Sequence, residues 1–319
     1  MLKKLIVTGI AGFCVATAAH AAYPDGPVTI VVPFPAGQTG DIIARNIGEQ
    51  LSKRLGQSFI VENRGGAGGR IGTAYAARGK NDGYTLLLTS TGPFAIAPSL
   101  YSTLNYQPLK DFEPVADIAA TPQILTVSNE SGVKSVEELL KKARSEDLSY
   151  ASAGNGSTQH LTMELFKQEL NVPMVHIPFK GSSESKTQVM SGLIPVTSDS
   201  LPAILPQIKS KQLKALAVVD VERSSYLPDV PTLAELGYPK FSTLAFFGLM
   251  APKGTPKEIV DLLNKNVNQI LDMPETQQRF EELALTPAKQ KTPEQFRQYL
   301  TDEVQKWAKV IDAADAKIE

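Results

Sequence analysis

The 319-residue sequence contains only one cysteine, three histidines and one tryptophan. A single cysteine excludes a disulfide scaffold and any zinc site built from cysteines. Neither sign of charge dominates, with 32 Lys and Arg against 33 Asp and Glu, which argues against a protein that binds nucleic acid. Hydrophobic residues make up 42% of the chain, enough for a core, and the length favours two lobes.

The first 21 residues have the pattern of a secretory signal peptide. Lys3 and Lys4 precede a mostly apolar run over residues 5–15, and Ala19-His-Ala21 matches an A-x-A cleavage signal. The run is too short to span a bilayer, and no later stretch reaches ~18 uninterrupted apolar residues. We therefore expect cleavage after Ala21, export to the periplasm, and a soluble mature chain that is not embedded in the membrane.

Strand and helix signals alternate through the first two thirds of the chain. Residues 28–32 form a β-branched run typical of a buried strand, and Asp41 opens an apolar stripe at helical spacing. Further strands are expected at 59–61, 85–88, 124–127, 149–152, 175–177, 194–197 and 213–219. This alternation predicts two doubly wound α/β units.

Three capping boxes mark expected helix starts, and the last third of the chain is mainly helical. The boxes are Ser135-Val-Glu-Glu138, Thr255-Pro-Lys-Glu258 and Thr292-Pro-Glu-Gln295. Trp307 belongs to an apolar stripe that we interpret as a core face. Because no low-complexity linker separates the sheets, we expect strands to cross between the lobes and the C-terminal helices to return to the first lobe.

Sequence templates for catalysis are mostly absent. There is no G-x-S-x-G elbow and no P-loop, and the glycines at 66–72 have the wrong spacing for a dinucleotide loop. A triad could be drawn from Ser157, His160 and Asp199, but any chain of this size offers such triples. Cleavage after Ala21 would remove His20 and the only cysteine, and the remaining His160 and His176 make a weak metal site. We expect no catalytic residue, no cofactor and no metal, and hence no enzyme.

Two loops, residues 34–41 and 153–160, occupy matching places in the two halves of the chain. Each joins the carboxyl end of an expected strand to a helix start, where backbone N–H groups lack partners and the helix dipole is positive. Glycines let the backbone approach a ligand, and side chains such as Gln38, Thr39 and Ser157 can form hydrogen bonds. Two such helix starts facing across a cleft would bind an anion, although two ordinary N-caps explain the same pattern.

An ordered set of segments resembles the Bug family, the extracytoplasmic solute receptors of tripartite tricarboxylate transporters. The similarity extends from about Tyr23 to the C-terminus. The segments are Val31-Val-Pro-Phe-Pro-Ala-Gly37, Val61-Glu-Asn-Arg64, Gly66-Ala-Gly-Gly69, Asp82-Gly-Tyr-Thr-Leu86, Ala153-Gly-Asn-Gly-Ser157, His176-Ile-Pro-Phe-Lys-Gly181, Leu227-Pro-Asp-Val-Pro-Thr232, Phe247-Gly-Leu249 and Ala251-Pro-Lys-Gly-Thr-Pro256.

This resemblance implies a two-lobed periplasmic binding protein of type II, in which each lobe is a doubly wound sheet flanked by helices. Lobe I would contain residues 22–122 plus 246–319, and lobe II residues 123–245. The ligand would lie in the cleft between the lobes, with one carboxylate held by the two loops. The residues that the resemblance places against the ligand are Phe34, Pro35, Ala36, Gly37, Gln38, Thr39 and Asp41, then Ala153, Gly154, Ser157 and Thr158, and at its far end Phe179, Lys180, Asp199 and Phe246 or Phe247.

The first loop departs from the family's usual Pro-Pro-Gly-Gly pattern, because Gln38 replaces a glycine and Gly40 replaces a small polar residue. Gln38 is therefore a candidate for direct contact with the ligand. Asp199 could bind an amino or hydroxyl group or cap the helix near Leu201. Lys180 could pair with a second carboxylate or remain solvated. The phenylalanines could hold an aromatic acid or form apolar walls.

The function implied is capture of a small organic carboxylate by cleft closure and its delivery to the inner-membrane subunits of a tripartite tricarboxylate-type transporter. We expect the receptor to be a monomer. Two rival functions stay open. A sensory accessory to a membrane kinase would share the fold and pocket, whereas an exported hydrolase would need an activated nucleophile that the sequence does not show.

Overall fold

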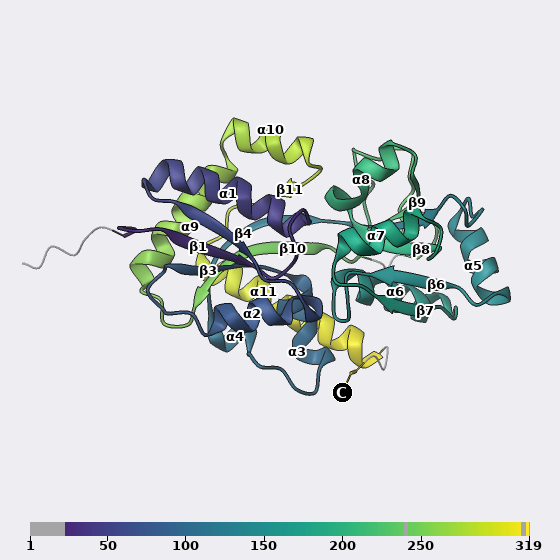
Figure 1. Ribbon diagram of the computed structural model, residues 1–319, viewed down its shortest axis with the longest axis horizontal. Coiled ribbons are helices and arrows are strands. Elements are labelled where there is room, and N and C mark those ends of the chain that lie inside the picture. The colour runs from purple at the N-terminus through teal and green to yellow at the C-terminus, as the bar shows by residue number, and fades with distance from the viewer. Residues whose placement is uncertain (1–22, 239–241, 314–316, 319) are drawn as a thin grey trace, which may run out of the picture.

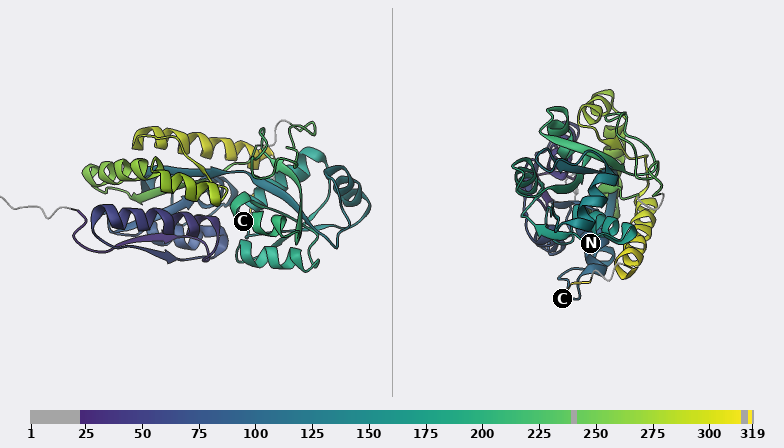
Figure 2. Two further views of the ribbon diagram at one scale, coloured as in Figure 1. Left: turned by 90° about the horizontal axis from the view of Figure 1, so that it is seen from above. Right: turned by 90° about the vertical axis from the view of Figure 1, so that its right-hand side faces the viewer.

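A computed structural model describes residues 23–238, 242–313 and 317–318 (Figure 1). The expected signal peptide and its cleavage site lie outside the described residues. The described chain forms two α/β lobes side by side along the long axis of the molecule (Figures 1 and 2). None of the helices in these ranges is long and apolar enough to cross a bilayer.

Lobe I is built on a six-stranded sheet with the order β11-β4-β10-β3-β1-β2. Strands β1, β2 and β3 are parallel, and β10 pairs antiparallel with both β3 and β4. The apolar run predicted as the first strand forms β1 in the middle of the parallel part. The strands are β1 (Val28–Val32), β2 (Phe59–Asn63), β3 (Thr85–Ser90), β4 (Phe112–Thr121), β10 (Ala245–Pro252) and β11 (Thr286–Pro287).

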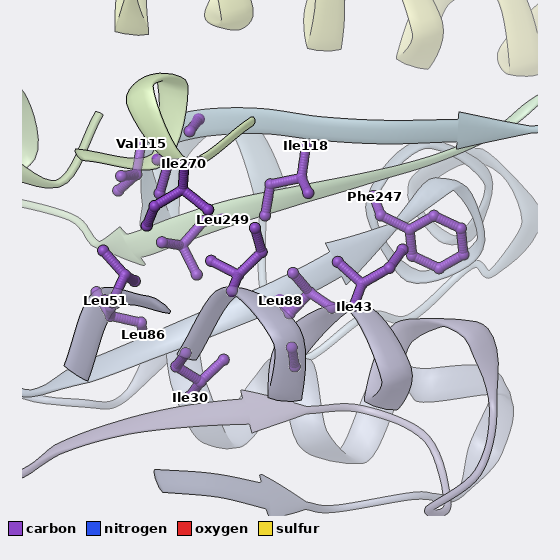
Figure 3. Close-up of a cluster of buried hydrophobic side chains, with 14 of the residues drawn as sticks. Ile30, Ile43, Leu51, Leu86, Leu88, Val115, Ile118, Phe247, Leu249 and Ile270 are labelled. Carbon is purple, nitrogen blue, oxygen red and sulfur yellow. The ribbon is translucent and has the colours of Figure 1, made fainter. Parts of the chain in front are cut away.

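Helices cover both faces of this sheet. On one face α1 and α9 bury apolar stripes against the strands, as Figure 3 shows for Ile43, Leu51 and Ile270. On the other face α11 packs Trp307 into a core that includes Phe94, which confirms the predicted core role of the tryptophan. The helices are α1 (Thr39–Leu55), η1 (Ala67–Gly69), α2 (Arg70–Ala77), η2 (Gly92–Ile96), α3 (Ala97–Leu100), α4 (Pro108–Asp111), α9 (Lys257–Leu271), α10 (Pro274–Glu282) and α11 (Pro293–Ala313).

Lobe II is built on a five-stranded sheet with the order β7-β6-β8-β5-β9. Strands β7, β6 and β8 are parallel, and β5 lies antiparallel between β8 and β9. Its elements are β5 (Gln123–Ser128), α5 (Val136–Ser145), β6 (Ser149–Ser152), α6 (Thr158–Leu170), β7 (Val175–Pro178), α7 (Ser182–Met190), β8 (Val196–Ser200), α8 (Leu201–Lys209) and β9 (Leu213–Val219).

The two lobes are joined by strands. Strand β4 of lobe I ends at Thr121, and after Pro122 the chain enters β5 of lobe II. The chain returns through β10, which begins at Ala245 and inserts between β3 and β4. The C-terminal helices α9 and α11 then pack on lobe I, as the sequence predicted. These features confirm the predicted two-lobed α/β fold class.

Two of the three predicted capping boxes cap their helices. Thr292 and Gln295 exchange hydrogen bonds between side chains and backbone N–H groups at the start of α11. At α5 the Ser135 hydroxyl accepts from Glu138 N–H, while the Glu138 carboxylate accepts from the preceding Lys134 N–H. The box at Thr255 is wrong, because α9 begins at Lys257 and the Thr255 hydroxyl donates to the Pro252 carbonyl instead.

Candidate functional site

A cavity of about 40 Å³ lies between the lobes. One water molecule needs roughly 10–15 Å³, so the cavity has space for about three waters. The residues of lobe I that line it are Phe34, Gln38, Thr39, Gly40, Ser90, Ala245 and Phe247. The residues of lobe II that line it are Gln123, Thr158, Gln159, Ser182, Asp199, Ser200 and Ala203.

Four helix starts contribute to this wall. Thr39 begins α1, Thr158 begins α6 and Ser182 begins α7, while Ser200 is the N-cap of α8. The first N–H groups of a helix lack partners within the helix, and the helix dipole is positive at this end. The described lining contains no Lys, Arg or His. Helix starts of this kind favour a bound anion, which makes the cavity a candidate anion site built from the main chain.

Asp199 is the one carboxylate in the wall and is fully buried. Its oxygens accept hydrogen bonds from the Ser182 hydroxyl, from Gln159 Nε2 at 2.8 Å and from the Ser200 N–H at 2.8 Å. Burial raises the pKa of Asp199, although the nearby Lys186 and these hydrogen bonds oppose the rise. Asp199 thus binds together the starts of α6, α7 and α8 within lobe II.

The lobes meet along a seam of glycines and short side chains beside the cavity. Across it, Thr39 Oγ1 of lobe I lies 2.8 Å from Ser200 Oγ of lobe II. A Cβ atom on Gly92 would lie 2.9 Å from the Gly156 carbonyl oxygen, and one on Gly68 would collide with the Asn155 carbonyl. Closure of the lobes therefore depends on the absence of side chains at these positions.

The first loop is fixed from behind by Asp41, which does not line the cavity. Its carboxylate accepts from Gly37 N–H at 2.9 Å and from Asn63 Nδ2 at 3.0 Å, and pairs with Arg45 at 2.9 Å. Burial alone would raise the pKa of Asp41, but these hydrogen bonds and the Arg45 charge outweigh it and lower the pKa. Asp41 positions the loop that presents Gln38 and Thr39.

The second loop rests on two stacked histidines. The Ser157 hydroxyl caps α6 by accepting from His160 N–H, and His160 Nδ1 accepts from Gly156 N–H. The rings of His160 and His176 stack with centroids 4.0 Å apart, and His176 Nε2 lies 2.6 Å from Ser152 Oγ. Burial lowers the pKa of His160 to about 4 and that of His176 to about 3.

The structure brings together some of the residues that the sequence singled out. Phe34, Gln38, Thr39, Thr158 and Asp199 line the cavity. The others are outside its wall: Pro35, Ala36, Gly37 and Asp41 in the first loop, Ala153, Gly154 and Ser157 in the second, and Phe179, Lys180 and Phe246.

The last two of these have other environments. Phe246 packs in the lobe I core, with its ring 6.4 Å from that of Phe94, while its neighbour Phe247 faces the cavity. Lys180 is exposed, and its backbone N–H donates to Glu184. Asp199 does not cap α8 at its second or third residue but accepts from the N–H of Ser200.

Sequence reasoning missed five of the seven lobe II residues in the wall, namely Gln123, Gln159, Ser182, Ser200 and Ala203. Ser182 and Ser200 lie where β7 and β8 give way to helices, so the rule that identified the two loops would have found them as well. Gln123 enters the wall only because β4 passes directly into β5. Within the described ranges no group of three His, Cys, Asp or Glu side chains is arranged to hold a metal ion.

Comparisons with known proteins show the family and the fold. Residues 43–315 match the family model described as the tripartite tricarboxylate transporter family receptor. Protein BugT of Bordetella pertussis is 38% identical over 100% of this chain and 99% of its own length.

Solved structures with the same fold include the periplasmic binding protein BugD, with a TM-score of 0.89, 34% identity, and coverage of 93% of this chain and 100% of that one. Rpa4515 of R. palustris, solved with adipate, has a TM-score of 0.88 and 36% identity, covering 92% of this chain and 98% of its own. The resemblance inferred from the sequence segments is confirmed.

Proposed function

This chain belongs to the tripartite tricarboxylate transporter receptor family, and we propose that it captures a small organic carboxylate by closure of its two lobes and delivers it to a membrane transporter of the tripartite tricarboxylate type. The observation that carries the proposal is the convergence of four helix starts on a cavity whose described lining contains no cationic side chain. Adipate in a structure 36% identical to this chain supports the ligand class.

The proposed mechanism is stabilisation of the closed form by ligand. Thr39 and Gly40 come from lobe I, whereas Thr158, Ser182 and Ser200 come from lobe II, so both sets of donors surround a ligand only when the lobes meet. The lobes proposed from the sequence, residues 22–122 with 246–319 and residues 123–245, would rotate about the strand crossings near Pro122 and Ala245. The closed pair of lobes would then present one surface to the transporter.

The remaining parts of the proposal rest on the family. We propose that the mature protein acts in the periplasm after cleavage at Ala21, as a monomer, and that it catalyses no reaction. BugD is named a periplasmic binding protein, and the family model describes receptors. Carboxylate contacts at the positions outside the cavity wall, such as Gly37 and Ala153, would have to form through bridging waters.

A thermal-shift screen tests the ligand class. The mature protein is refolded to remove bound molecules and exposed to mono-, di- and tricarboxylates, aromatic acids and, as controls, sugars and neutral amides. A ligand at ~100 times its dissociation constant adds about 2.7 kcal/mol to the free energy of unfolding. Stabilisation by a carboxylate supports the proposal, and a panel without any response from carboxylates contradicts it.

Two neighbouring variants test the site. Thr158→Ala removes a hydroxyl from the wall, so we expect weaker carboxylate binding in calorimetry with little change in stability. Ser157→Ala removes the α6 cap outside the wall, so it should cost about 1 kcal/mol of stability with little change in affinity. Lys180→Ala should change neither. If Ser157→Ala weakens binding while Thr158→Ala lowers only the stability, this placement of the site is refuted.

A further inference from the structure

The wall of the cavity contains two buried amide atoms that have no hydrogen-bond partner in the described structure. They are Gln38 Nε2 and Gln123 Oε1. Gln38 is 7% exposed and Gln123 is 1% exposed, and both line the cavity. A buried polar group without a partner is costly, and native proteins leave few of them.

Several other polar side chains of the wall bond to one another. Thr39 pairs with Ser200 across the seam, and Gln159 and Ser182 donate to Asp199. Among the fully buried polar atoms of the wall, these two amide atoms are the ones left without a partner in the described structure. One unpartnered atom is a donor and the other an acceptor, and exchanging the amide nitrogen and oxygen of either side chain still leaves hydrogen-bonding capacity unused.

Gln38 also restricts the space of the cavity. It is the N-cap of α1, but its side chain makes no cap hydrogen bond; instead it extends across the seam onto the backbone of Gly181 in lobe II. The cavity of about 40 Å³ is small for any acid with a long carbon chain, and Gln38 lies in its wall and against Gly181 at the seam. The side chain is thus placed both to limit ligand length and to contact the ligand.

We propose that the ligand is a short hydroxycarboxylate of four carbons or fewer, and that Gln38, together with Gln123, is the residue that sets this specificity by hydrogen bonding the hydroxyl group. A hydroxyl is the group that donates and accepts at once, so it can satisfy an amide donor and an amide acceptor together. The helix starts hold the carboxylate. This inference rests on the proposed function, because it names the ligand class of the same site.

Calorimetry with matched acids tests it. Malate and succinate carry the same charges and differ by one hydroxyl, as do lactate and propionate. We expect the wild-type protein to bind the hydroxylated member of at least one pair at least about tenfold more tightly, because an acid without the hydroxyl leaves the amides unpartnered. Gln38→Leu and Gln123→Leu should each bring this ratio close to one.

Two further variants distinguish a lost ligand contact from a general effect of the substitution on folding. Gln207→Leu changes a glutamine whose Oε1 is also buried without a partner but which lies outside the cavity wall, so it should keep the wild-type ratio. Gln38→Gly is tolerated at an N-cap and enlarges the cavity, so the affinity for adipate relative to succinate should rise at least about tenfold.

The outcomes distinguish a failure of this inference from a failure of the proposed function. If carboxylates bind but no pair is discriminated, or if Gln38→Leu keeps the wild-type ratio, the inference is overturned and the proposed function stands. If Gln38→Gly leaves chain-length preference unchanged, the role of Gln38 in limiting length is overturned. If no carboxylate binds at all, the proposed function itself fails and the inference fails with it.

Discussion

A methyl group at Gly92 should hold the two lobes apart. Gly92 starts η2 in lobe I, and a Cβ atom there would lie 2.9 Å from the Gly156 carbonyl oxygen and 3.4 Å from Ser157 Cα in lobe II. Gly92 is not among the residues with positive φ, so alanine can adopt its backbone conformation without strain. The perturbation is therefore steric and acts across the seam.

The free-energy cost of closing the lobes in Gly92→Ala follows from the steric overlap between the new Cβ atom and the Gly156 carbonyl oxygen. The nearest ordinary carbon–oxygen contacts are about 0.5 Å longer than the 2.9 Å found here, so the lobes must separate by about that distance or distort. Overpacking of this size costs about 1–3 kcal/mol. Only the closed form bears this cost, so carboxylate affinity should fall roughly 5- to 150-fold while the free energy of unfolding without ligand changes little.

Calorimetry and small-angle X-ray scattering measure the two consequences. The Gly92→Ala protein should bind its carboxylate more weakly, and its radius of gyration should decrease less on ligand addition than that of the wild type. Gly26→Ala is the control, because a Cβ there would meet only Tyr84 Cε1 at 4.0 Å, away from the seam. Wild-type affinity and full compaction in Gly92→Ala would refute the view that closure depends on this backbone contact.

Two further predictions concern buried charge. The folded pKa of His160, about 4, lies below the unfolded value of 6.5, so this histidine should cost up to about 3 kcal/mol of stability as pH falls through that window. In urea titrations His160→Gln should remove this contribution and leave that of His176, whose pKa is also lowered, to about 3; a pH dependence identical to that of the wild type would contradict it. Lys291→Met leaves the buried Asp117 carboxylate unpaired, so it should cost about 2 kcal/mol at pH 7. Burial already raises the Asp117 pKa, so protonation should shrink this deficit at pH 5, and a deficit that is constant with pH would argue against it.

The parts of the fold that could be predicted from sequence are those set by local pattern. The β-branched run at Val28–Val32 and the alternating Leu213–Val219 became strands with the expected bounds. Strands crossing between the lobes were expected, but β4 and β10 were not located, because β4 contains Pro114 and charged residues, and β10 is an apolar run without a period. Their structure comes from pairing with each other across the sheet.

Tertiary contacts also determine the features that the local sequence pattern predicted wrongly or left open. Thr255 and Thr292 begin the same Thr-Pro pattern, yet only Thr292 caps its helix, because Thr255 is drawn into the turn at the end of β10 by its bond to Pro252. The choice between Phe246 and Phe247 was a question of strand register. Successive side chains on a strand face opposite sides, so Phe246 packs in the core beside α11, whereas Phe247 packs in the core beside α1 and also reaches the cavity.

The sequence indicated the place of the candidate site better than it identified the side chains that line it, and there is a physical reason for this. The attraction for an anion comes from the backbone at helix starts, which glycine-rich loops after strands reveal without regard to side-chain identity. Since the main chain supplies the charge complementarity, side chains such as Gln38 can change without loss of carboxylate binding. Differences in ligand choice among related receptors should therefore concentrate at such positions, where one substitution alters the length of the cavity and its hydrogen bonds together.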